Sequence, residues 1–379
     1  MSNICTTKLL NMKTSQSLQT VEVTTGNIYA PWSSKKINEW YNNNHWPIGC
    51  NYIPHNAINQ LEMWQEETFD AQLIDKELGW AAELGFNSMR VFLHHLLWEQ
   101  DSTGFISRIE TFLSIADKYG IKPMFVLFDG VWDPFPKTGI QPVPRNLVHN
   151  SGWVQSPGFD VLNDASKYDD LHAYVHGVVD HFKNDTRVLI WDIFNEPDNM
   201  NTGSYKDDNY VQHKAELAVN LLKKSIGWIR QIDPIQPITM APWQCNWGDD
   251  ATISALDNFM FLNSDIISFH CYEDKVSMEK IILQLKRYGK PMVCTEYMAR
   301  PLNSTFKDIL PVLQRHNVGA YNWGFVAGKS QTHIAWDSWH TPYEKEPELW
   351  FHDILRADGK PYCEKEAAYL TRFNKKYAC

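Results

Sequence analysis

Two short apolar stretches of the sequence each carry a glutamate near their end, and these two acids have the clearest potential for chemistry. Glu196 lies in the stretch 191–197, and Glu296 lies in the stretch 291–297. Both stretches are rich in β-branched and aromatic residues, which predicts buried strands that deliver their acids to the carboxyl end. Two carboxylates that meet in this way could cleave a glycosidic bond, because one can protonate the leaving oxygen while the other attacks the sugar.

Eight extended apolar runs alternate with amphipathic segments from about residue 46 onward. The runs cover residues 46–54, 86–94, 122–129, 188–196, 237–243, 265–272, 291–298 and 319–327. Helical stripes of apolar residues are expected near residues 74–84, 106–119, 171–182, 211–230, 276–288, 304–316 and 362–374. The first helix is expected to stop at Gly85, because glycine readily takes the left-handed conformation that follows many helices. This alternation predicts an α/β fold, in the form of a single (β/α)8 TIM barrel.

A doubly wound parallel sheet is the alternative architecture. It would be expected to carry a glycine-rich phosphate-binding turn after the first strand, and the sequence Gly-Cys-Asn-Tyr at residues 49–52 is not such a turn. No domain boundary is evident along the chain. We therefore expect residues 1–30 to form an N-terminal arm, either poorly ordered or strapped across the barrel, and residues 31–379 to form one catalytic (β/α)8 domain.

Composition narrows the classes of partner. The chain of 379 residues has a net charge of −10 and no basic run, so neither nucleic acid nor an anionic membrane is an expected partner. No apolar stretch approaches the length of a membrane span, and we expect a monomer. The sixteen tryptophans exceed what a core of this size requires. Because aromatic faces stack on the apolar face of a sugar ring, this excess favours a carbohydrate cleft, although core packing could account for about half of these residues.

The seven cysteines do not form a recognisable site, since no CxxC pair occurs. Several lie in apolar runs, where a small buried thiol is the ordinary interpretation. The pattern is compatible with a cytoplasmic protein, or with a secreted or periplasmic one whose export signal is absent from this chain.

Two long segments rich in proline, glycine and tryptophan follow the third and eighth predicted strands, at about 130–166 and 328–346. In a barrel, the loops after the strands build the active site. Four tryptophans in these loops are candidate platforms for sugar rings, and about half of them are expected to serve instead to hold the loops in place. They are Trp132, Trp153, Trp336 and Trp339.

Five short motifs occur in order along the chain, each at a predicted strand end. They are residues 85–90, Asn195-Glu196, His270-Cys271-Tyr272, Thr295-Glu296-Tyr297 and Asn322-Trp323-Gly324. Together they resemble clan A of the glycoside hydrolases, and within it the family-five enzymes of the cellulase and β-mannanase type. The resemblance covers about residues 45 to 375.

The resemblance implies a role for each of these residues. Glu296 would be the nucleophile, and Glu196 would be first the general acid and then the general base. Arg90 and the hydroxyl of Tyr272 would keep Glu296 charged and oriented. Asn195 would bind the 2-hydroxyl of the sugar.

Further residues would shape the cavity under the same resemblance. Trp323 would form the floor beneath the sugar that is attacked, and His270 and Trp243 would line the same cavity. The two carboxyl groups would lie about 5 Å apart, which implies retention of anomeric configuration.

Each candidate also has a simpler interpretation. Arg90 could brace the barrel by pairing with a buried acid, and Asp192 is expected to be a buried barrel acid. Asp129, Asp133 and Glu273 could bind sugar hydroxyls or be solvated loop carboxylates.

The pair His94-His95 suggests a metal site, but neighbouring strand residues face opposite sides, so only one could point into the barrel. No further histidine or cysteine cluster completes a ligand set. We expect His95 to contact substrate or to pack in the core, and we expect no metal or organic cofactor.

The expected function is a retaining β-glycosidase acting on a β-linked polysaccharide or oligosaccharide, with β-1,4-mannan or β-1,4-glucan favoured over xylan. The sequence does not distinguish internal from terminal cleavage. Two alternatives remain open at this stage: a non-catalytic carbohydrate-binding barrel, and a metal-dependent barrel hydrolase that would use His94 or His95.

Overall fold

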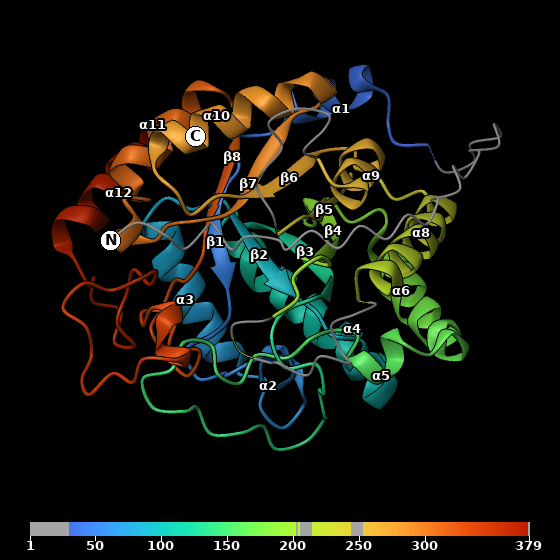
Figure 1. Ribbon diagram of the computed structural model, residues 1–379, viewed down its shortest axis with the longest axis horizontal. Coiled ribbons are helices and arrows are strands. Elements are labelled where there is room, and N and C mark those ends of the chain that lie inside the picture. The colour runs from blue at the N-terminus through green and yellow to red at the C-terminus, as the bar shows by residue number, and fades with distance from the viewer. Residues whose placement is uncertain (1–29, 202–203, 205–213, 244–252, 378–379) are drawn as a thin grey trace, which may run out of the picture.

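The protein folds as a (β/α)8 barrel (Figure 1). The computed structural model describes residues 30–201, 204, 214–243 and 253–377. Within them, eight parallel strands form one sheet in the order β5-β4-β3-β2-β1-β8-β7-β6. The strands are β1 (Ile48–Tyr52), β2 (Ser88–Phe92), β3 (Lys122–Asp129), β4 (Ile190–Asn195), β5 (Ile238–Ala241), β6 (Ile267–His270), β7 (Met292–Tyr297) and β8 (Gly319–Asn322). Each lies inside one of the eight predicted runs, so the predicted barrel is confirmed.

The barrel closes between β5 and β6 through contacts at the start of these strands. The amide of Asp265 donates to the carbonyl of Ile238 at 2.8 Å, and the hydroxyl of Thr239 donates to the carbonyl of Ile266 at 2.7 Å. The side chain of Asp265 in turn accepts from the amide of Ile238 at 2.9 Å. Side chains therefore supplement the ladder where regular strand pairing is incomplete.

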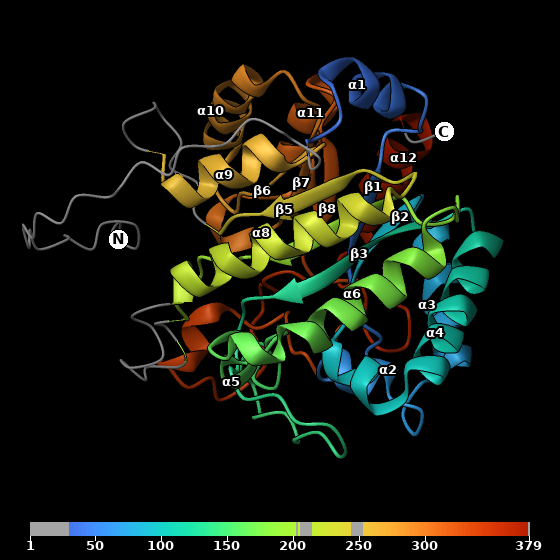
Figure 2. The same cartoon turned by 90° about the vertical axis from the view of Figure 1, so that its right-hand side faces the viewer.

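Helices surround the sheet (Figures 1 and 2). They are α1 (Ser34–Asn42), α2 (Gln60–Trp64), α3 (Ala71–Glu83), α4 (His95–Lys118), α5 (Phe159–Leu162), α6 (Tyr168–Phe182), α8 (Lys214–Ile232), α9 (Ala255–Asn263), α10 (Lys275–Leu285), α11 (Phe306–Arg315) and α12 (Glu364–Tyr377). Helix α3 buries Ile74, Leu78 and Ala81 and is followed by Gly85 at φ +81°, as its pattern predicts. A side chain at Gly85 would also meet Asn374 at 2.8 Å, so glycine is required there both by conformation and by space.

Four helices of the structure, α1, α2, α5 and α9, were not expected from the sequence. Helix α1 carries only Ile37 and Tyr41 as buried residues, so its apolar stripe is too sparse to recognise. These side chains pack with Met124, Val293 and other residues near the beginnings of the strands, at the end of the barrel opposite Glu196. Helix α1 thus packs at this end of the barrel, whereas residues 1–29 of the arm predicted for residues 1–30 lie outside the described part of the chain.

None of the helices in the described residues is both long enough and apolar enough to cross a bilayer. The predicted helix at 211–230 appears as α8 from Lys214 onward, and residues 211–213 lie outside the described ranges.

Candidate active site

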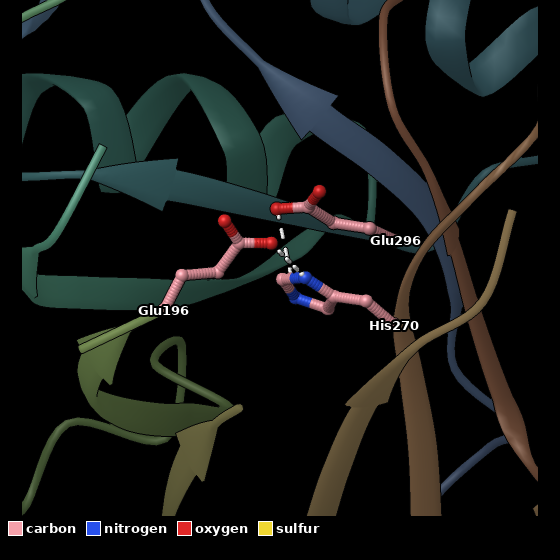
Figure 3. A group of neighbouring side chains, drawn as sticks. All are labelled: Glu196, His270 and Glu296. Atoms are coloured by element: carbon pink, nitrogen blue, oxygen red, sulfur yellow. Dashed lines mark hydrogen bonds and ion pairs between the residues drawn. The ribbon is translucent and has the colours of Figure 1, made fainter. Parts of the chain in front are cut away.

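The two glutamates converge at the carboxyl end of the barrel. Glu196 follows the last residue of β4 directly, and Glu296 lies near the end of β7. One carboxylate oxygen of each acid and one ring nitrogen of His270, at the end of β6, lie within 4.8 Å of one another (Figure 3). Each glutamate is only 6% exposed. Two acids from strands that are three apart in chain order thus meet in one small, largely buried space.

The backbone holds Glu196 in an uncommon conformation. Its φ is +47°, in the left-handed region that non-glycine residues seldom adopt. Its amide donates to the carbonyl of Ala241 at 2.7 Å, and its carbonyl accepts from the amide of Asn199 at 3.0 Å. Gly130 packs against it so closely that a side chain there would come within 2.2 Å of the Glu196 carbonyl oxygen. Strain of this kind persists only where surrounding contacts over-determine the backbone, and it is frequent at active sites.

Glu296 is surrounded by donors that favour its anion. Nη1 of Arg90 donates to Oε1 at 3.0 Å, and the hydroxyl of Tyr272 donates to Oε2 at 2.6 Å. Burial raises the pKa of Glu296, while His270, Arg90 and Tyr272 act in the opposite direction. Because burial raises the pKa of Tyr272 well above its usual value, this hydroxyl stays protonated and remains a donor.

Arg90, on β2, contacts both a buried barrel acid and Glu296. Its guanidinium is fully buried and donates to Oδ2 of Asp192 from Nη2 at 2.7 Å and from Nε at 3.0 Å. It also donates to Oδ1 of Asn195 at 2.7 Å. The same side chain therefore braces the barrel interior and places a positive charge beside Glu296.

The hydrogen-bond partners of Glu196 are uncharged, in contrast to the guanidinium of Arg90 beside Glu296. Its Oε2 accepts from Nδ2 of Asn199 at 2.8 Å, and its Oε1 lies 2.7 Å from Nδ1 of His270. Burial raises the pKa of Glu196 to about 7, and the hydrogen bond from Asn199 only partly opposes this shift. Burial also lowers the pKa of His270 to about 4, so this ring is neutral near pH 7. With one ring proton, His270 can donate to the Glu196 carboxylate or accept a proton from its acid form.

Asn195 is held between two partners. Its Oδ1 accepts from Arg90, and its Nδ2 donates to Oδ1 of Asp129 at 2.9 Å. Asp129 is 1% exposed and also accepts from the indole of Trp153 at 2.6 Å. Burial raises the pKa of Asp129 to about 7. Of the two interpretations left open for Asp129, solvation is wrong: this acid is buried and positions the amide of Asn195.

The candidate tryptophans occupy different environments. Trp323, directly after β8, keeps 9% of its surface exposed and packs edge-on against Phe92 and Trp153. Trp153 is 2% exposed and bonded to Asp129, so it holds its loop in place. Trp243, after β5, is 43% exposed.

The other candidates, Trp132 and Trp336, lie at the rim of the site together with Trp339. Trp132 stacks on Trp339 with ring centroids 5.5 Å apart. Trp336 contacts Tyr272 edge-on at 4.9 Å. All three are partly exposed.

The histidine pair departs from its expected geometry. Strand β2 ends at Phe92, so His94 caps helix α4 and His95 begins it, and strand alternation does not apply. The two rings stack at 4.8 Å, and burial lowers both pKa values. His94 contacts the carbonyl of Gln155 at 2.9 Å, and His95 lies 3.1 Å from the hydroxyl of Ser156. The pair thus anchors the loop after β3, and His95, at 1% exposure, makes these contacts rather than any to the two glutamates.

Within the described residues, the one group with metal-ligand spacing is Glu196, His270 and Glu296. Arg90 already donates to Oε1 of Glu296, and a guanidinium on this oxygen disfavours a second cation there. Neither His94 nor His95 belongs to the group. Of the two other acids considered, Glu273 is exposed and Asp133 caps a turn through the amide of Phe135.

Two residues that the sequence did not single out contribute to the site. Asn199 binds Glu196, and Lys214, at the start of α8, donates to the carbonyls of Gly130 and Asn199, each at 2.5 Å. Asn199 lies three residues after Glu196, a spacing that could have indicated it. No local pattern marks Lys214, because its contacts depend on the packing of α8.

Comparison with known proteins identifies the family of the chain. The sequence matches the cellulase family, glycosyl hydrolase family 5, over residues 42–341. Among curated protein sequences, none matches the chain significantly.

Three solved structures illustrate the fold similarity. The GH5_18 protein from Streptomyces cattleya, in complex with GlcNAc, has a TM-score of 0.58 at 14% identity, covering 88% of this chain and 80% of its own. An exo-β-1,4-mannosidase from Opitutaceae bacterium strain TAV5 has a TM-score of 0.54 at 19% identity, covering 87% and 59%. The endo-β-1,4-mannanase from Thermotoga petrophila has a TM-score of 0.54 at 14% identity, covering 89% and 78%. The match to the family model covers most of this chain, and it establishes that the chain belongs to glycosyl hydrolase family 5 and is an O-glycosyl hydrolase acting on β-glycosides.

Proposed function

We propose that the protein is a retaining β-glycosidase that cleaves β-linked oligosaccharides or polysaccharides, with Glu296 as nucleophile and Glu196 as acid/base. The observation that carries the proposal is the pair of buried carboxylates, whose nearest oxygens lie within 4.8 Å. Retaining enzymes have carboxyl groups about 5 to 5.5 Å apart, whereas inverting enzymes need about 6.5 to 9.5 Å to admit a water. The separation here favours direct attack on the sugar.

The unequal partners of the two acids support the assignment of roles. A nucleophile must be ionised, and the cation of Arg90 and the hydroxyl of Tyr272 both favour the anion of Glu296. A general acid must hold a proton near neutral pH, and burial raises the pKa of Glu196 to about 7. Removing the charge of Glu296 when it bonds to the sugar would then lower the pKa of Glu196, which suits its change from acid to base.

The reaction would take two steps. In the first, Glu296 attacks the anomeric carbon while Glu196 protonates the departing oxygen, forming a glycosyl–enzyme and releasing the aglycone. In the second, Glu196 removes a proton from water, the water oxygen bonds to the anomeric carbon, and Glu296 leaves as the carboxylate.

Neighbouring side chains would bind the sugar. The amide nitrogen of Asn195 carries two hydrogens, of which one is bonded to Asp129, so the other can serve the 2-hydroxyl. Trp323 would form the floor under the attacked ring, His270 would line the cavity, and Trp243 would contact the leaving sugar. The rim residues Trp132 and Trp336 are proposed as further contacts, whereas the buried position of His95 favours a supporting role.

A β-1,4-mannan or β-1,4-glucan substrate is favoured, with xylan less so. Support comes from the family and from its neighbours, one of which is described as an endo-β-1,4-mannanase. No cofactor is needed in this mechanism, since both the acid and the nucleophile are side chains.

Azide rescue tests the roles directly. The variants Glu296→Ala and Glu196→Ala should each lose several orders of magnitude in turnover. With azide and an activated aryl β-glycoside, Glu296→Ala should form the α-glycosyl azide, and Glu196→Ala should form the β-glycosyl azide. Glu83→Ala, which removes an exposed acid at the last position of α3, is the matched control and should retain activity. The same azide anomer from both variants would contradict the roles, and full activity in both would reject the function.

A further inference from the structure

Two loops at the carboxyl end of the barrel are joined to each other. They are the β3 loop (residues 130–158) and the β8 loop (residues 323–363), which lie at the same end of the molecule (Figures 1 and 2). Residues 145–150 of the first contact residues 330–339 of the second, and we call these contacts the loop bridge. In the sheet, β8 and β3 are separated by β1 and β2, so the bridge passes across two intervening strands.

Seven hydrogen bonds form the loop bridge. Four involve backbone amides or the buried imidazole of the β3 loop: Asn150 N to Ser330 O at 2.8 Å, Leu147 N to Gln331 Oε1 at 2.7 Å, His149 N to Ser338 Oγ at 3.0 Å and His149 Nδ1 to Ile334 O at 2.8 Å. Three are donated from the β8 loop: Trp339 Nε1 to His149 O at 2.8 Å, and Gln331 Nε2 to Arg145 O at 2.7 Å and to Val148 O at 3.3 Å.

Aromatic contacts reinforce the loop bridge. Trp132 and Trp339 lie face to face with only 6° between their planes, and the guanidinium of Arg145 lies 4.8 Å from the Trp339 ring. Burial lowers the pKa of His149 to about 4, so this imidazole is neutral and its single proton serves the carbonyl of Ile334. A connection with this many satisfied polar groups is a fixed part of the structure rather than a passing contact.

The β1 loop (residues 53–59) also contacts these two loops. The side chain of Asn59 donates to the carbonyl of Gly152 at 2.8 Å, and the amide of Lys329 donates to the carbonyl of His55 at 2.9 Å. The loops after β1, β3 and β8 therefore form a continuous wall on one side of the barrel mouth.

The orientation of the substrate decides whether its glycone or its leaving group points toward this wall. The departing oxygen must lie next to Glu196, at the end of β4, while the attacked ring lies over Trp323, at the end of β8. A glycone of more than one sugar would continue beyond Trp323, away from Glu196, and this is the direction of the wall.

Trp323 and residues of the loop bridge border one small cavity. This cavity measures about 20 Å³ and is lined by Asn150, Ser330 and Thr332 of the loop bridge, together with Trp153, Trp323 and residues that follow β1 and β8. Such a volume holds about one water molecule. The amide of Asn150, 1% exposed, has neither polar atom bonded within the described residues, which makes it a suitable partner for that water or for a terminal hydroxyl.

We infer that the loop bridge ends the binding site at the sugar over Trp323, so that the enzyme removes single sugars from the non-reducing end of β-linked oligosaccharides. This inference rests on the proposed function and names its substrate class. The fold alone does not decide the matter, since the similar structures include proteins described as exo-β-1,4-mannosidase and as endo-β-1,4-mannanase.

Oligosaccharides labelled at the reducing end test the inference. With β-1,4-linked manno- and gluco-hexaoses, the wild-type protein should first produce a labelled product one sugar shorter together with free monosaccharide. A 4-O-methyl cap on the non-reducing sugar should block this release, and the viscosity of the corresponding polymer should barely change. Early appearance of labelled di- or trisaccharides, hydrolysis of the capped substrate, or a rapid fall in viscosity would each overturn the inference.

A variant links the outcome to the loop bridge. Trp339→Ala removes the stacking partner of Trp132 and one hydrogen bond to His149, and should raise the ratio of internal to terminal cleavage about tenfold or more. Trp228→Ala on α8, where the indole contacts His172, is the matched control and should leave this ratio unchanged. An unchanged ratio in a folded Trp339→Ala protein would refute the role of the bridge.

Activity on an aryl β-glycoside distinguishes failure of this inference from failure of the proposed function. Hydrolysis of this substrate together with internal cleavage of the hexaoses would reject terminal action and leave the glycosidase standing. Failure of the wild-type protein to hydrolyse any of the aryl β-glycosides or oligosaccharides would reject the proposed function and this inference with it.

Discussion

The hydroxyl of Tyr272 offers a sharp test of how the site keeps Glu296 charged. Tyr272→Phe deletes one donor to Oε2 of Glu296, a contact of 2.6 Å in a buried site. The phenyl ring would keep the edge contact with Trp336 and the contact with His352, so the packing changes little. The substitution therefore isolates a single hydrogen bond to a charged group.

The size of the effect follows from the type of bond. Hydrogen bonds to charged groups contribute about 1.5 to 3 kcal/mol, which corresponds to a loss of about 10- to 150-fold in kcat/KM if the bond holds the reactive anion. The lost donor favoured the charged form, so the pKa of Glu296 must rise. The acidic limb of the pH–rate profile should then move to higher pH, while the basic limb stays in place.

The assay is the pH dependence of kcat/KM on an aryl β-glycoside. Tyr297→Phe is the control, because the Tyr297 hydroxyl is buried without a hydrogen-bond partner among the described residues, and its removal should change neither limb. A Tyr272→Phe protein with kcat/KM within twofold of wild type would refute the reasoning. A large loss of rate with an unmoved acidic limb would show that the hydroxyl acts through geometry rather than through the charge of Glu296.

Three further predictions concern the acid, its support and metal dependence. Because Glu196 must be protonated to act and its pKa is raised to about 7, kcat/KM should fall as the pH rises through about 7, and Glu196→Gln should abolish this basic limb of any residual activity. Lys214→Met removes one hydrogen bond from each of the buried carbonyls of Gly130 and Asn199 and leaves them with the side-chain amide of Asn201 as donor, so urea denaturation should show a loss of about 1 to 3 kcal/mol of unfolding free energy; Lys223→Met, on the same helix, should cost much less. A strong chelator should leave the rate unchanged, since Arg90 supplies the positive charge beside Glu296, and chelator-sensitive turnover restored by a divalent ion would contradict this mechanism.

Local patterns predicted most of the elements. All eight strands were predicted because each is a continuous apolar run, and parallel strands buried on both faces have this composition. Helix α3 was predicted together with its stop at Gly85, since its stripe and its cap lie within a few residues of each other. Helix α1 was missed because only two of its residues are buried, and β2 was drawn too long because the apolar run leads into His94 without a break.

Contacts between distant segments could not be predicted in this way. Trp153 and Trp323 are chemically identical, yet one is held against Asp129 and the other keeps a face at the site. The buried state of Asp129, the support from Lys214 and the joining of the β3 and β8 loops all depend on segments that lie far apart in the chain.

The sequence by itself determined which residues end the strands, and with them that Glu196 and Glu296 would be presented at the same end of a closed sheet. This follows from local preferences, because strand direction and the carboxyl-end position of a residue depend only on nearby residues. Tertiary structure alone decided the different surroundings of the two acids, since burial and the arrival of Arg90, Tyr272 and Asn199 set their charges. The limit that we infer for the substrate beyond Trp323 likewise depends on tertiary structure, because it rests on contacts between two loops separated by almost 200 residues.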